Sequence, residues 1–156
     1  MFWFILVYAV LLSALTGYTM AIQGTTLALG RLLVPGSAII SRTGLQDAIT
    51  PKMQTIRNIV AMILFVPLFI LTTYAYAWYH VIWVIVATFL ASTAFPIILG
   101  MRAGSTRIVS IILSDMEKRR KAYQKSGDEL RSTAIGDLIN RVKDIPHEEI
   151  MKEVNR

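Results

Sequence analysis

A run of 42 residues without a formal charge, Ile59 to Gly100, constrains the fold of this chain more than any other feature. As one helix the run would measure roughly 63 Å at about 1.5 Å per residue, whereas the hydrocarbon core of a bilayer is only about 30 Å thick. We therefore expect two membrane crossings within it, over about 59–77 and 81–100. Because a backbone in lipid must satisfy its own hydrogen bonds, both crossings should be helical and form a hairpin.

The N-terminal block is equally apolar, since residues 1–30 carry no charged side chain. It lacks the basic region of a secretory signal, so we expect a retained span over about 2–23, with a cleaved signal as the alternative. Hydrophobic residues make up 54% of the chain and charged ones 17%, which is too apolar for an ordinary soluble domain. The sequence predicts an all-α integral membrane protein with three transmembrane helices in residues 1–101.

Basic residues predict the orientation of these spans. The loop 31–57 carries four Lys/Arg and Arg102 follows the last span, whereas neither the N-terminus nor the aromatic turn 74–80 carries any. By the positive-inside rule the N-terminus and the turn lie outside, and the C-terminus is cytoplasmic. A bacterial inner membrane is the expected location. Within the loop, Pro35-Gly36 predicts a turn, and 32–40 is apolar but too short to span.

Small and polar residues recur at spacings of three and four in the first span, and a second small face lies on the third. Such faces usually let helices approach closely in lipid; a pore lining is the alternative. The predicted helix-packing residues are Ser13, Thr16, Gly17, Met20, Gln23, Gly24, Ala87, Thr88, Ala91 and Ser92.

Two prolines interrupt the hairpin, Pro67 in the second span and Pro96 in the third. Each removes a backbone donor and clashes with the preceding turn, which predicts a kink. Matching kinks could form a hinge, although prolines also serve packing in membrane helices.

The tail, residues 102–156, carries 12 Lys/Arg against nine Asp/Glu and has the periodicity of three amphipathic helices. The segment Ser126-Gly-Asp-Glu129 fits a capping box at the start of the second helix. A basic run near the membrane is expected to contact anionic headgroups, or a protein partner, together with an apolar face. These predicted contact residues are Lys118, Arg119, Arg120, Lys121, Leu130, Ile135, Leu138 and Ile139.

Residues suited to catalysis are scarce. The chain has no cysteine, and His80 stands without a second histidine or acid nearby, so an interfacial role outweighs a metal or pH-sensing one. His147-Glu148-Glu149 suits a helix start and does not have the spacing of a zinc site. We expect no enzymatic activity, no cofactor, no metal and no nucleic acid partner.

These features predict a structural or accessory subunit of a membrane complex, formed with other membrane proteins or with copies of itself. The alternative is a self-assembling pore. Three spans, an outside N-terminus and a charged inside tail are similar to the arrangement of one class of phage holins, and the likeness covers topology only. A lipid-modifying enzyme that uses His80 is a more distant third.

Overall fold

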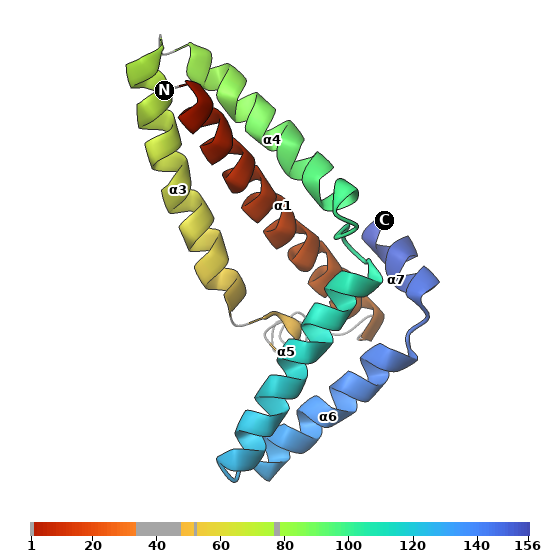
Figure 1. Ribbon diagram of the computed structural model, residues 1–156. Coiled ribbons are helices and arrows are strands. Elements are labelled where there is room, and N and C mark those ends of the chain that lie inside the picture. Colours follow the sequence, from red (N-terminus) through yellow and green to blue (C-terminus); the bar gives the residue numbers. More distant parts are fainter. Residues whose placement is uncertain (1, 34–47, 52, 77–78) are drawn as a thin grey trace. The chain divides into compact units, whose positions relative to one another are not determined.

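The computed structural model describes residues 2–33, 48–51, 53–76 and 79–156, with the side chains of 2–4 and 53 left out. The expected turn at Pro35-Gly36 and most of the short apolar segment 32–40 fall outside these residues. The described part of the chain folds into helices and contains no strand (Figure 1). The helices are α1 (Phe2–Leu33), α3 (Met53–Ala75), α4 (His80–Ile98), α5 (Thr106–Lys125), α6 (Glu129–Asp144) and α7 (His147–Val154).

Three of the described helices are long and apolar enough to cross a membrane, which confirms that part of the prediction. Their apolar segments are Ile5–Leu33, Gln54–Ala75 and His80–Ile98, with mean hydropathies of 1.9, 2.0 and 2.3. Helix α1 continues ten residues past the expected end at Gln23 and reaches about 48 Å, well beyond a 30 Å bilayer core. The physical reason is that no proline follows Gln23 within α1, and isolated glycines such as Gly24 and Gly30 are tolerated in a helix.

The chain divides into two compact units. The first unit comprises Met1–Met20 and Lys52–Met101, and the second comprises Ala21–Pro51 and Arg102–Arg156. The C-terminal part of α1 therefore lies in the same compact unit as the tail.

In the first unit, the N-terminal part of α1 lies between α3 and α4 (Figure 1). Its core contains Ile5 and Leu12 from α1 and Ala61 and Leu68 from α3. The Tyr8 hydroxyl donates a hydrogen bond to the Leu64 carbonyl oxygen at 2.8 Å, which joins α1 to α3 near the core.

Both hairpin helices continue through their prolines. Pro67 lies inside α3, and Pro96 lies in the last turn of α4, where its carbonyl oxygen accepts the Met101 N–H at 2.7 Å. Gly100 follows with a φ of 63°, the left-handed conformation with which glycine commonly ends a helix. Pro96 thus stands at a helix end, where it disturbs little of the hydrogen-bond ladder.

The second unit is built around the antiparallel pair α5 and α6. Their facing sides are apolar and buried, because isoleucines recur every three or four residues on both helices. The buried residues are Ile108, Ile112 and Met116 on α5 and Ile135, Ile139 and Val142 on α6.

The turn between α5 and α6 differs in one detail from the expected capping box. Asp128 is the N-cap of α6, and its carboxylate accepts the Arg131 N–H at 3.1 Å. The Ser126 hydroxyl instead donates to the Tyr123 carbonyl oxygen at the end of α5. The prediction that Ser126 caps α6 is therefore wrong, because the serine is used to close the preceding helix.

The C-terminal part of α1 and the short helix α7 complete the second unit. The Thr25 hydroxyl accepts the Gly104 N–H at 2.7 Å and donates to the Ala21 carbonyl oxygen at 2.8 Å. An added Cβ at Gly104 would lie 2.9 Å from the Met151 sulfur on α7, so the backbone passes close to that helix. At the surface, Arg31 pairs with Glu153 at 3.4 Å.

Candidate functional site

Two small-residue faces meet where α1 packs on α4. We call this contact the α1–α4 seam and define it by Ser13 and Gly17 on α1 and Thr88, Ser92 and Pro96 on α4. The Ser13 hydroxyl lies 3.2 Å from the Thr88 carbonyl oxygen. An added Cβ at Gly17 would lie 2.8 and 2.9 Å from Pro96 Cγ and Cδ and closer still to the Ser92 carbonyl oxygen. The helix backbones are therefore in contact, and the small-residue faces of α1 and α4 cover each other within the chain.

The other predicted packing residues are less uniform in their placement. On α1, Met20 and Gln23 are exposed, whereas Thr16 and Gly24 are half-buried. Gly24 and Ala103 both belong to the second unit, and a Cβ added at Gly24 would lie 3.2 Å from the Ala103 Cβ. On α4, the remaining two residues are exposed Ala87 and half-buried Ala91.

A polar contact between α1 and α3 was not expected from the sequence. The Gln54 amide nitrogen donates to the Thr19 carbonyl oxygen at 2.9 Å, while its Oε1 is buried without a partner in the described structure. One turn further along α3, the Arg57 guanidinium lies 5.1 Å from the centre of the Tyr18 ring, a cation–π distance. Gln54 and Arg57 appear in the sequence only as polar residues ahead of a span, so no pattern there indicates their partners.

The predicted basic run separates into two pairs with different surroundings. Arg119 is nearly buried; it binds the Asp115 carboxylate at 2.8 Å and donates to the backbone carbonyl oxygens of Ala48 and Thr50. Arg120 pairs with Glu117 at 2.8 Å on the same helix. These two arginines are thus engaged within the chain, and Arg119 holds the Ala48–Thr50 backbone against α5.

The lysines of the run are exposed on the opposite side of α5. Lys118, Lys121 and Lys125 lie three and four residues apart, so they share one helix face, which we call the basic face of α5. Every residue of α5 is described, and none of its exposed residues is acidic. Both acids of this helix, Asp115 and Glu117, are paired with arginines. The positive charge of the basic face is consequently not neutralised by its own helix.

The apolar tail residues proposed for partner contact are mostly used internally. Ile135 and Ile139 are buried on α6, and Leu138 is half-buried. Leu130 alone of these four is strongly exposed, with 83% of its surface accessible, at the first turn of α6 beside the end of the basic face.

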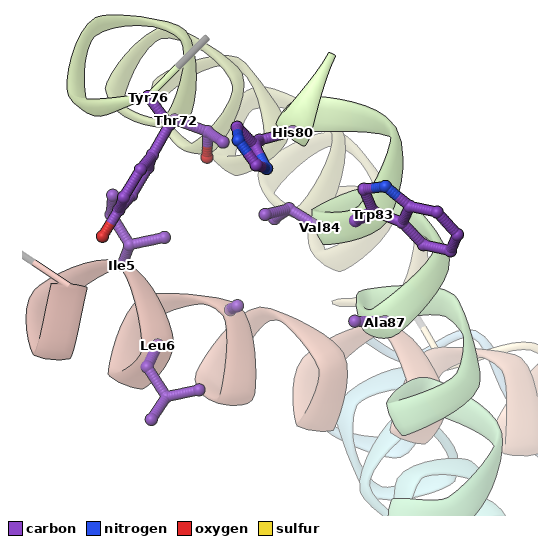
Figure 2. A pocket seen from close by; sticks show the side chains of 9 residues that line it. Ile5, Leu6, Thr72, Tyr76, His80, Trp83, Val84 and Ala87 are labelled. Carbon is purple, nitrogen blue, oxygen red and sulfur yellow. The ribbon is translucent and has the colours of Figure 1, made fainter. Parts of the chain in front are cut away.

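The first unit contains an apolar pocket of about 390 Å³ at the end where α3 and α4 are connected (Figure 2). Residues from the three long apolar helices line it: Ile5, Leu6, Ala9, Thr72, Tyr76, His80, Trp83, Val84 and Ala87. His80 lies at this end of α4 with its ring centre 5.8 Å from that of Tyr76 and 4.5 Å from that of Tyr79. The sequence placed His80 in an aromatic cluster but did not indicate a pocket, because the α1 residues are contributed from far along the chain.

Among the described residues, no group of three or more His, Asp or Glu side chains is arranged to hold a metal ion. No protein-family model matches the sequence, and neither a curated protein nor a solved structure matches the chain. The functional argument therefore rests on the surfaces described above.

Proposed function

We propose that this protein is a non-enzymatic accessory subunit of a membrane complex, which docks on an acidic surface of a partner protein through the basic face of α5. In the proposed orientation the N-terminus lies outside a bacterial inner membrane and the tail lies in the cytoplasm. The observation that carries the proposal is the exposed group Lys118, Lys121 and Lys125, whose charge is not offset by any exposed acid on the same helix.

The internal packing of the chain supports this choice of surface. The α1–α4 seam is filled by its own residues, and the apolar sides of α5 and α6 are buried against each other. Neither surface is open to a partner. Exposed like charges on one helix face repel one another, and an acidic partner converts that repulsion into attraction and steers association.

The spans themselves favour a structural role. Proton pumps and ion-coupled carriers ordinarily need a charged side chain at membrane depth. The segment 59–100 and residues 2–30 carry none. The membrane helices can supply anchoring and contact area without such a group.

The experiment is a charge reversal of the basic face followed by isolation of the complex. The tagged full chain is purified from its native membrane in mild detergent, and the mass and composition of the complex are measured by light scattering. The variant Lys118→Glu/Lys121→Glu/Lys125→Glu should release the partner. A matched control reverses two exposed cations on α6, Arg141→Glu/Lys143→Glu, and should retain it.

Three results would overturn the proposal. The wild-type chain could run as a monodisperse monomer without a companion. It could bind vesicles containing phosphatidylglycerol through the same lysines while no protein co-purifies, which would assign the basic face to lipid. Expressed alone, it could release an entrapped dye, which would assign the chain to the pore-forming class.

A further inference from the structure

We propose that the pocket at the connected end of α3 and α4 binds one acyl chain of a membrane phospholipid, with the headgroup at the level of His80 and Tyr76. We call it the acyl pocket. This inference concerns the first unit alone and does not depend on the partner proposed above.

The first argument is the size and chemistry of the acyl pocket. Ligand sites are typically clefts of roughly 300–1,000 Å³, lined mainly by apolar and aromatic side chains with a few placed polar groups, and often lie between the helices of a bundle. The pocket measures about 390 Å³ and has walls from three helices. Of its polar side chains, Thr72 already donates its hydroxyl to the Leu68 carbonyl oxygen at 2.7 Å. The ligand must therefore be largely apolar.

The second argument is the order of the lining residues along the helices. His80 is the first residue of α4, and Tyr76 follows the last residue of α3, so both polar rings lie at the connected end of these helices. Ala87 lies seven residues deeper, about 10 Å at 1.5 Å per residue. Figure 2 shows His80 and Tyr76 at one end of the pocket and Ala87 further along α4. A polar end at the interface above an apolar interior matches the polarity of a lipid with its tail inserted.

The neighbouring pocket provides an internal comparison. A second apolar hollow of about 270 Å³ lies between α3 and α4, and Thr72 and Val84 line both. Neither His80 nor Tyr76 lines this second hollow. Without a histidine or tyrosine ring in its lining, it has nothing to position a headgroup, so the specific lipid is assigned to the acyl pocket.

Photocrosslinking tests the assignment. The full chain is reconstituted in vesicles of phosphatidylethanolamine and phosphatidylglycerol that contain a phosphatidylethanolamine with a diazirine in its acyl chain. Wild-type crosslinks should concentrate in peptides containing Ile5–Ala9 and Trp83–Ala87. The variant Ala87→Phe fills the pocket and should reduce them on the order of tenfold, the change that corresponds to 1.4 kcal/mol of binding free energy.

Two further variants keep the test decisive. Ala94→Phe adds the same ring to an exposed position of α4 outside both pockets and should leave the crosslinks unchanged. Ala87→Leu adds a smaller group and should give a partial reduction, and it decides the question if the phenylalanine variant does not fold. The inference is overturned if Ala87→Phe and Ala94→Phe show equal crosslinking, which would indicate bulk lipid only. It is also overturned if the pocket peptides crosslink to a second copy of the chain in place of lipid.

Discussion

Replacement of Gly17 by alanine tests the α1–α4 seam most directly, because the structure leaves no room for the added carbon. The new Cβ would lie 2.8 and 2.9 Å from ring carbons of Pro96 and closer still to the Ser92 carbonyl oxygen. Real Cβ atoms essentially never have contacts shorter than 3.0 Å. A carbonyl oxygen of a helix cannot rotate away as a side chain can. To restore the optimal separation of about 3.5–4.0 Å at these contacts, α1 has to retreat from α4 by roughly 1 Å or more.

The expected change in the free energy of unfolding of Gly17→Ala has three contributions. Forcing an extra methyl group into a packed contact costs about 1–3 kcal/mol. Separating the helices also weakens the contact of the Ser13 hydroxyl with the Thr88 carbonyl oxygen at 3.2 Å; because this hydroxyl also donates to the Ala9 carbonyl oxygen at 2.6 Å, the loss is at most about 0.6 kcal/mol, the average for hydrogen bonds between membrane helices. The higher helix propensity of alanine opposes these losses and stabilises the helix by up to about 1 kcal/mol. We expect Gly17→Ala to lower the free energy of unfolding by about 1–2 kcal/mol.

Gly136→Ala is the matched control. This glycine also lies inside a helix, but its added Cβ would have the Arg120 Cδ as its nearest neighbour at 3.6 Å, an ordinary contact. Only the higher helix propensity of alanine then acts, and the free energy of unfolding of the variant should rise by about 0.5–1 kcal/mol. Both free energies are measured by reversible unfolding in mixed micelles with increasing denaturing detergent. Equal or greater stability of Gly17→Ala relative to the wild type would refute the close approach of α1 and α4.

Two further substitutions test the second unit. Arg119→Gln removes the contacts to the Ala48 and Thr50 carbonyl oxygens, so we expect about 1.5–3 kcal/mol of destabilisation and faster trypsin cleavage after Lys52. Thr25→Val leaves the buried Gly104 N–H without its acceptor and should cost about 1–3 kcal/mol, measured as a lower unfolding midpoint.

Each of these variants has a control of the same residue type. Arg120→Gln breaks only a pair with Glu117 on the helix surface and should change stability by less than about 1 kcal/mol. Thr26→Val removes a bond to the Gln23 carbonyl oxygen within the same helix and should cost less than Thr25→Val. If control and test variants have equal effects, neither Arg119 nor Thr25 holds the segments that the structure assigns to them.

The sequence was sufficient for features that depend on local pattern. Uncharged runs of sufficient length predicted three apolar helices, and apolar periodicity predicted helices in the tail. It was insufficient where the outcome depends on residues far apart in the chain. Nothing near Thr25 indicates the Gly104 N–H, and nothing near Arg119 indicates the carbonyl oxygens of Ala48 and Thr50.

The basic run shows the same limit at the candidate site. Four consecutive cations were treated as one surface, yet successive residues of a helix point in different directions, about 100° apart at 3.6 residues per turn. Lys118 and Lys121 are exposed, whereas the two arginines between them turn toward acids of the chain. Helical geometry divides the run, but the sequence alone does not show which side is covered.

The hydroxyl groups of the α1–α4 seam have a consequence for how these two helices associate. Ser13, Thr88 and Ser92 each donate to a carbonyl oxygen of their own helix, at 2.6, 2.7 and 2.7 Å. Their polar hydrogens are therefore already satisfied before α1 meets α4. Within the α1–α4 seam, neither helix therefore presents an unsatisfied hydroxyl donor to the other, and close packing of small residues contributes more to the contact than new hydrogen bonds do.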